Sequence, residues 1–120
     1  MGAEPRRATI LVVDDDAAVR DYAETVLADA GYAVLTAPDG AAALRLVRCC
    51  GAIDLLFTDI VMPGLDGFEV ARQARDAMPG LKVLYTSGYA SDLQRADRLL
   101  KKPYRPQQLA DEIAASLKES

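Results

Sequence analysis

The sequence predicts an α/β fold: a five-stranded parallel sheet with strand order 2-1-3-4-5 and helices on both faces. Three observations predict it. Short apolar runs alternate five times with segments of helical periodicity. The first of these runs is apolar throughout, which is typical of a strand buried on both faces of a parallel sheet. Glycine and proline mark most boundaries between the segments.

Each expected element has its own signal. The first strand is the β-branched run Ile10–Val13, and Asp16 is placed to cap the helix that follows, which Gly31 ends. The remaining elements, in chain order, are a strand over Tyr32–Leu35, a helix from Ala41 to about Cys50, a strand over Ile53–Thr58, a helix capped by Asp66 and closed by Pro79-Gly80, a strand over Leu81–Thr86, a short strand over Leu99–Lys101 and a helix opened by Arg105-Pro106.

Composition excludes several classes of function. The 120 residues are enough for one domain with a real core. A net charge of −4 without a basic block argues against a nucleic-acid surface within the chain. No apolar run is long enough to cross a bilayer, and no apolar segment after Arg6 and Arg7 resembles a secretion signal, so we expect a cytoplasmic protein without membrane contact.

The absence of histidine is equally informative. It rules out histidine acid-base catalysis and Ser-His-Asp triads, and it leaves Cys49 and Cys50 without the further ligands that a zinc site needs. These two cysteines are adjacent in sequence, where disulfide geometry is rarely met. We therefore expect two thiols in the last turn of a helix.

Five polar residues follow or end the apolar runs. Asp14 and Asp15 come after the first strand, Asp59 after the third, Thr86 ends the fourth and Lys102 follows the fifth. Alone, each has a plain interpretation as a helix cap, a turn residue, a strand-end hydroxyl or a surface charge. Since the carboxyl ends of parallel strands share one edge of the sheet, all five are expected together beside the switch point, and their joint placement favours a site.

The chemistry of such a site follows from the side chains. Three neighbouring carboxylates raise one another's pKa, and a hard divalent ion with oxygen ligands, which we expect to be Mg²⁺, would offset their mutual repulsion. A carboxylate oxygen of Asp59 can attack a phosphoryl group to form an acyl phosphate. The metal and the Lys102 ammonium would neutralise charge on the transferring group, and the Thr86 hydroxyl can donate to a third oxygen.

At this point the chain resembles a known family, the CheY-like receiver domain of response regulators in bacterial two-component signalling. The resemblance covers essentially the whole chain, in the family's order, and implies a flavodoxin-like sheet over residues 9–119 behind an N-terminal tail of residues 1–8. The matching motifs are Leu11-Val12-Val13-Asp14-Asp15, Thr58-Asp59-Ile60-Val61-Met62-Pro63-Gly64-Leu65-Asp66-Gly67, Thr86-Ser87 and Lys102-Pro103-Tyr104.

The resemblance implies roles for these residues. Asp59 would be the phosphoacceptor, Thr86 the switch hydroxyl and Lys102 the lysine that contacts the phosphoryl group. The family's Lys-Pro peptide is often cis, so Lys102-Pro103 is a candidate for that bond. The domain would be a signalling module that assists its own phosphorylation and dephosphorylation, not an enzyme. A histidine kinase or a histidine phosphotransfer protein would be its donor, and an unknown downstream protein its target.

The resemblance also implies a metal site. Mg²⁺ would be held directly by Asp15, Asp59 and the backbone carbonyl of Val61, and by Asp14 largely through water.

The sequence departs from the family at two places. The position three residues before the lysine, commonly Tyr or Phe, is Leu99, which has no ring to reorient. Only residues 87–98 separate the fourth and fifth strands, so the helix between them is expected to be short and weakly held. The chain would then signal through a different surface, or order this segment on phosphorylation.

Other functions remain open at this stage. A phosphotransferase of the haloacid-dehalogenase kind would need a second aspartate where Val61 stands. A flavodoxin-like electron carrier would need a hydroxyl- and glycine-rich phosphate loop where Asp14 to Asp16 stand. A receiver-like interaction module that is not phosphorylated is the third alternative. A stand-alone regulator and the receiver of a hybrid kinase are both compatible with the residues.

Overall fold

The computed structural model describes residues 7–50, 52–89, 96 and 98–118. The strands are β1 (Thr9–Val13), β2 (Ala33–Ala37), β3 (Leu55–Asp59), β4 (Lys82–Ser87) and β5 (Leu99–Lys101). The helices are α1 (Ala17–Asp29), α2 (Gly40–Cys50), α3 (Gly67–Ala77) and α4 (Pro106–Lys118).

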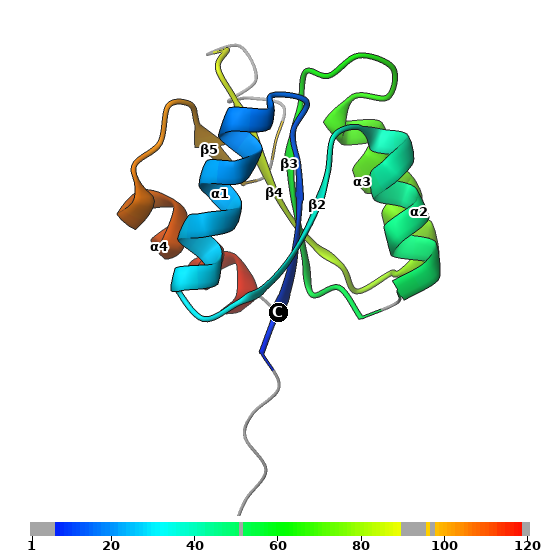
Figure 1. Ribbon diagram of the computed structural model, residues 1–120. Coiled ribbons are helices and arrows are strands. Elements are labelled where there is room, and N and C mark those ends of the chain that lie inside the picture. Colours follow the sequence, from blue (N-terminus) through cyan, green and yellow to red (C-terminus); the bar gives the residue numbers. More distant parts are fainter. Residues whose placement is uncertain (1–6, 51, 90–95, 97, 119–120) are drawn as a thin grey trace, which may run out of the picture.

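The five strands form one parallel sheet in the order β2-β1-β3-β4-β5, which confirms the predicted topology. Helices α1 and α4 cover one face, and α2 and α3 cover the other (Figure 1). Because every strand runs in the same direction, all five carboxyl ends meet at the upper edge of the sheet in that view. The loops that leave this edge carry the candidate site.

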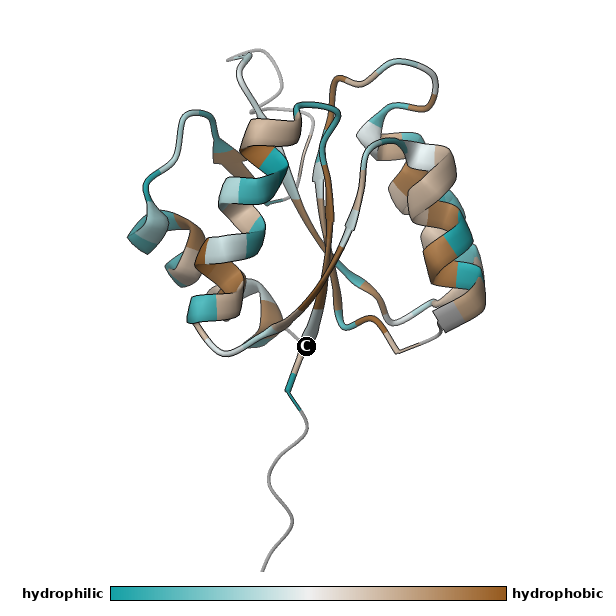
Figure 2. Ribbon diagram, in the orientation of Figure 1, coloured by the Kyte–Doolittle hydropathy of each residue, from teal (hydrophilic) through white to brown (hydrophobic). Residues whose placement is uncertain are grey.

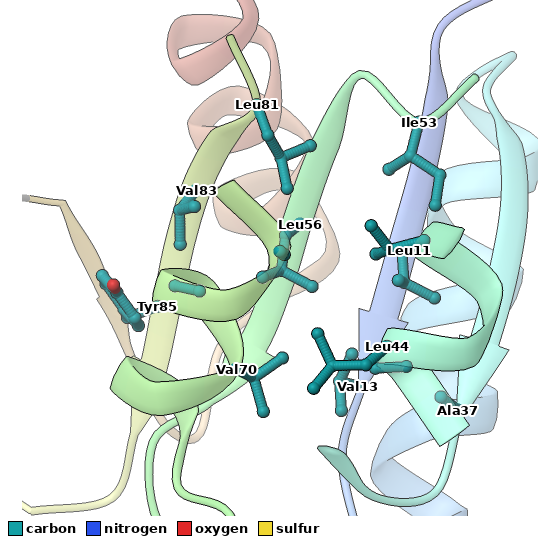
Figure 3. Close-up of a cluster of buried hydrophobic side chains, with 14 of the residues drawn as sticks. Leu11, Val13, Ala37, Leu44, Ile53, Leu56, Val70, Leu81, Val83 and Tyr85 are labelled. Carbon is teal, nitrogen blue, oxygen red and sulfur yellow. The ribbon is translucent and has the colours of Figure 1, made fainter. Parts of the chain in front are cut away.

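Strand side chains alternate between two cores, one on each face of the sheet. Figure 3 shows Leu11, Val13 and Leu56 on the sheet, with Leu44 of α2 and Val70 of α3 beside them. All five are buried, and each buried leucine contributes about 1.5–3 kcal/mol relative to an exposed one. Figure 2 colours much of the central strands as hydrophobic, and the apolar residues of β1 and β3 are buried on both faces of the sheet.

The second core lies under α1 and α4. Ile10, Val12 and Phe57 point to this face, where they pack with Leu27 of α1 and Ile113 of α4. All five side chains are almost completely buried. Two cores of this kind fix the sheet from both sides and leave its loops free to carry polar groups.

The predicted range of the second strand, Tyr32–Leu35, is wrong by one residue at its start and two at its end. The first residue of that range donates its N–H to the Leu27 carbonyl (3.1 Å) and so completes the turn that ends α1. Thr36 and Ala37 pair with the end of β1 and extend the strand. The turn contains Gly31, whose φ of +98° favours glycine.

Two further strands are shifted toward the site. The strand predicted over Ile53–Thr58 is observed at Leu55–Asp59, because Asp59 itself pairs with Thr86 in the ladder. The strand predicted over Leu81–Thr86 is observed at Lys82–Ser87, because Ser87 pairs with Lys101. The first strand and the second helix each begin one residue earlier than predicted, at Thr9 and Gly40.

The short helix predicted between the fourth and fifth strands falls largely on residues 90–95 and 97, which lie outside the described residues. Beside them, Tyr89 is exposed and Ala96 packs against the core that contains Leu99. Within the part of the chain that the structure describes, no helix has both the length and the apolar character needed to span a membrane.

Candidate functional site

The loop after β1 holds its acidic residues in a defined turn. Asp14 is 2% exposed, and its backbone N–H donates to the Ala37 carbonyl (3.3 Å). One carboxylate oxygen of Asp14 accepts the backbone N–H of Asp16 (2.9 Å). Asp16 in turn caps α1 by accepting the N–H groups of Ala18 and Val19, as predicted. The turn therefore buries one aspartate and leaves Asp15 exposed beside it.

Asp59 is the last residue of β3 and lies at the centre of the sheet edge. Asp59 is buried, with 6% of its surface exposed. The ladder continues past it, because Ile60 donates its N–H to the Thr86 carbonyl (3.0 Å). The buried Thr58 hydroxyl donates to the backbone carbonyl of Asp59 (2.9 Å). The backbone around this aspartate is thus fixed on both sides.

Gly67 brings the start of α3 against the same backbone. It donates its N–H to the Ile60 carbonyl (2.8 Å). A Cβ atom placed on Gly67 would lie 2.4 Å from the Asp59 carbonyl oxygen and 2.9 Å from the Ile60 Cα. Any larger residue would have to displace the end of β3, so the close approach requires glycine here.

Lys102 reaches the acidic residues from the end of β5. Its backbone N–H donates to the Ser87 carbonyl (2.9 Å), which extends the pairing with β4. Its ammonium nitrogen lies 2.8 Å from a carboxylate oxygen of Asp14 and 3.2 Å from one of Asp59. The Lys102–Pro103 peptide is cis, as the family resemblance implied. One lysine therefore bridges two of the three carboxylates.

The electrostatics reflect this burial and pairing. Burial raises the pKa of the Asp59 carboxyl group above its ordinary value, and the negative charge of Asp14 adds to that effect. The Lys102 ammonium and a backbone hydrogen bond from Val61 act in the opposite direction without cancelling it. Burial alone would lower the pKa of Lys102, but its bonds to Asp14 and Asp59 outweigh burial and raise it. The positive charge of Lys102 therefore offsets only part of the cost of burying the Asp59 carboxylate.

The Thr86 hydroxyl has unused hydrogen-bonding capacity. The residue is 1% exposed, and its hydroxyl oxygen has no hydrogen-bond partner among the residues that the structure describes. A buried polar atom without a partner costs about 1–3 kcal/mol. Because Thr86 pairs directly with Asp59 in the ladder, a group attached to Asp59 could recover this cost.

The acidic residues form a cluster that could hold a metal ion. One carboxylate oxygen each from Asp14, Asp15 and Asp59 lies within 4.8 Å of the others. Oxygen donors of this kind suit a hard divalent cation. The two oxygens of Asp14 are already engaged, one by the Asp16 N–H and one by Lys102, whereas Asp15 is exposed. The residues present therefore fit a hard divalent cation, with Asp15 as the most accessible of the three carboxylates.

These residues line a surface cleft at the sheet edge. Its walls include Val61, Gly88 and Tyr89 in addition to the acidic residues and Lys102. Of the residues expected at this edge, Asp14, Asp15, Asp59, Val61 and Lys102 line the cleft, whereas Thr86 is not among the lining residues and is paired with Asp59 in the ladder. The prediction missed Tyr89, which is 60% exposed, and the packing role of Gly67. A glycine straight after the helix cap Asp66 is a sequence signal that could have indicated Gly67.

Leu99, which stands where the resembling family commonly has an aromatic residue, lies at the edge of the core. It pairs with Tyr85 of β4 and packs, half-buried, against the cluster under α2 and α3. Tyr85 in turn stacks on Phe68 of α3, with ring centroids 4.8 Å apart. The leucine therefore fills the space beside β4 without presenting an aromatic ring.

Comparison with known proteins gives a consistent picture. The family model described as "Response regulator receiver domain" matches residues 10–114. The response regulator receiver protein CpdR of Brucella abortus is 36% identical over 115 residues, which cover 90% of this chain and 95% of CpdR. The sensor kinase CckA of the same organism is 35% identical over 120 residues, 93% of this chain but 13% of CckA.

Solved structures of response regulators and receiver domains have the same fold as this chain. The receiver domain from the hybrid histidine kinase CckA superposes with a TM-score of 0.83 at 37% identity, covering 92% of this chain and all of that one (100%). The response regulator protein TrrA from Thermotoga maritima, in complex with Mg²⁺-BeF, gives a TM-score of 0.80 at 30% identity, covering 90% of this chain and 97% of TrrA.

Proposed function

The chain belongs to the response regulator receiver domain family, and from this premise we propose that Asp59 is its phosphoacceptor. The observation that carries the proposal is the environment of this one carboxylate. It is buried, it lies 3.2 Å from the Lys102 ammonium, and it pairs with a threonine whose buried hydroxyl lacks a partner among the described residues. These are the groups that a phosphoryl group on Asp59 would contact.

The transfer proceeds by attack of an Asp59 carboxylate oxygen on the phosphorus of a phosphohistidine. The new P–O bond forms as the P–N bond breaks, and the histidine nitrogen departs with the bond's electron pair. Lys102 stabilises charge on the transferring group, and the Thr86 hydroxyl donates to one of its oxygens once it is attached to Asp59. Hydrolysis of the resulting acyl phosphate resets the site, so the domain is a switch and not a turnover enzyme.

The metal in this proposal is Mg²⁺. When bound, it neutralises negative charge on the phosphoryl group during transfer. Asp15, Asp59 and the Val61 carbonyl would hold it directly, and Asp14 through water, because both Asp14 oxygens are engaged. The Mg²⁺-BeF complex of TrrA, a protein of the same fold, supports this choice.

The donor would be a histidine kinase or a histidine phosphotransfer protein, acting in the cytoplasm. Residues 9–119 would form the receiver domain and residues 1–8 a tail. The chain spans nearly all of CpdR but a small part of CckA, and a stand-alone regulator and a hybrid-kinase receiver each have a relative in support.

The test is intact mass spectrometry after incubation with acetyl phosphate, with and without Mg²⁺. We expect the wild-type chain to gain one phosphoryl group only with Mg²⁺, and Asp59→Asn to gain none. Asp76→Asn, which changes an exposed aspartate of α3, is the matched control and should behave as wild type.

A wild-type chain that binds Mg²⁺ and is folded, yet takes no phosphoryl group from acetyl phosphate or from phosphohistidine donors, would contradict the proposal. That result would favour a receiver-like interaction module that is not phosphorylated.

A further inference from the structure

Helix α1 is bonded to the loop that carries the acidic residues. The guanidinium of Arg20 donates to the backbone carbonyl of Asp14 (2.8 Å). Arg20 is half-buried and lies one turn into the helix, where its own N–H donates to the Asp16 carbonyl (2.9 Å). A charged donor makes a stronger bond to a carbonyl than a neutral one does. Arg20 thus ties the turn between β1 and α1 to the body of the helix.

The same helix is bonded to the loop that carries Lys102. The Tyr22 hydroxyl donates to the backbone carbonyl of Tyr104 (3.2 Å), two residues after the lysine. The two rings lie 5.9 Å apart, and the Tyr104 ring also makes an edge contact with Phe57 at 5.8 Å. Tyr104, two residues after Lys102, is therefore held between α1 and the core.

These two contacts converge on one ion pair. Asp14 and Lys102 belong to different loops, yet their charged atoms lie 2.8 Å apart. We propose that Arg20 and Tyr22 are positioning residues, which brace the two loops from α1 and so set the geometry of the Asp14–Lys102 pair for metal binding and phosphoryl transfer. Neither residue is among those that line the cleft at Asp59. The inference rests on the proposed function, because it concerns the same site.

The sign of the effect on metal binding separates positioning from simple electrostatics. Arg20 is a cation bonded to the backbone of Asp14, one of the three clustered aspartates, so its charge alone would repel a divalent ion held there. If charge were its main influence, neutralising it would strengthen Mg²⁺ binding. If it positions the acidic turn, its loss should weaken Mg²⁺ binding in spite of the lost repulsion. One substitution therefore gives opposite results under the two explanations.

The first experiment measures Mg²⁺ affinity by isothermal titration on the full chain. We expect Arg20→Met to raise the Kd about fivefold, because the loss of a hydrogen bond from a charged donor outweighs the relief of its repulsion on the metal. Arg20→Lys keeps a charged donor and should recover part of that loss. Arg48→Met, which removes an exposed arginine of α2, is the matched control and should leave the Kd unchanged. An Arg20→Met chain that binds Mg²⁺ as tightly as wild type, or more tightly, overturns the proposal.

A metal-free measurement accompanies it. The Asp16 N–H is held by the Asp14 carboxylate, so loosening the turn should speed hydrogen exchange at Asp16 in Arg20→Met, with α3 unchanged. An unchanged rate of hydrogen exchange at Asp16 would refute the inference that Arg20 holds this turn in place.

The second experiment addresses the other contact. Tyr22→Phe keeps the ring and removes only the hydroxyl, so we expect the rate of phosphorylation by acetyl phosphate at saturating Mg²⁺ to fall about threefold. Acetyl phosphate is used because a protein donor would also contact the surface around Tyr22. Tyr32→Phe is the control. If Tyr22→Phe is phosphorylated at the wild-type rate, Tyr22 is not a positioning residue. If the wild-type chain neither binds Mg²⁺ nor takes a phosphoryl group, the proposed function itself fails.

Discussion

Replacement of Gly67 by alanine should damage the site without touching any of its charged groups. The added Cβ would lie 2.4 Å from the Asp59 carbonyl oxygen and 2.9 Å from the Ile60 Cα, so the start of α3 and the end of β3 must separate. Overpacking of this kind costs about 1–3 kcal/mol. Alanine at a helical position recovers roughly 0.5–1 kcal/mol relative to glycine. We therefore expect a net loss of up to about 2.5 kcal/mol in the free energy of unfolding.

Gly80→Ala provides the control, because a Cβ on Gly80 meets nothing within 4 Å. Urea unfolding of the two variants, followed by circular dichroism, compares their stabilities. Since the displaced backbone carries Asp59, acetyl phosphate should phosphorylate the Gly67→Ala variant more slowly than the Gly80→Ala variant. If Gly67→Ala is as stable as Gly80→Ala and phosphorylates at the wild-type rate, the close approach does not constrain the site and the reasoning is refuted.

Three further predictions concern the charged and buried groups. Lys102→Met should raise the pKa of Asp59 further, because its main cationic neighbour is lost, and carbon NMR titration of the carboxyl group would detect this. Without Mg²⁺, Asp59→Asn should be more stable than wild type at neutral pH, and this advantage should shrink as the pH falls through the raised pKa of Asp59 and be gone below about 3.8. The sign follows because a raised pKa in the folded state favours folding at low pH and that contribution is lost as Asp59 ionises; denaturant midpoints against pH would measure it. Thr86→Val should leave the free energy of unfolding unchanged or raise it by up to about 1 kcal/mol, because a partnerless buried hydroxyl is removed, yet shorten the lifetime of the acyl phosphate in a mass-spectrometric decay assay.

The sheet order could be predicted because apolar runs, glycines and helical periodicity are local signals, and crossover rules restrict how they assemble. The site could be predicted for the same reason, since strand direction alone brings Asp14, Asp59 and Lys102 to one edge. Strand ends were less predictable. Asp59 and Ser87 are polar and look like loop residues, but pairing with β4 and β5 includes them in the ladder.

The supporting contacts could not be predicted from the sequence. Gly67 matters because of a distance to the backbone of another element, and Arg20 and Tyr22 matter because of bonds from α1 to two different loops. Such contacts depend on how helices sit on the sheet, which periodicity does not specify. Arg20 and Tyr22 read as ordinary polar positions on a helix surface.

The bridging position of Lys102 also sets the formal charge of the site. With three carboxylates and one ammonium, the cluster carries two negative charges when all four groups are ionised. A divalent ion brings this to neutrality, and conversion of the Asp59 carboxylate to an acyl phosphate then restores about one negative charge. The two states of the domain would therefore differ by a single unit of charge in a largely buried place. A monovalent ion would leave residual repulsion before transfer, so valence, as much as ligand geometry, would select the cation.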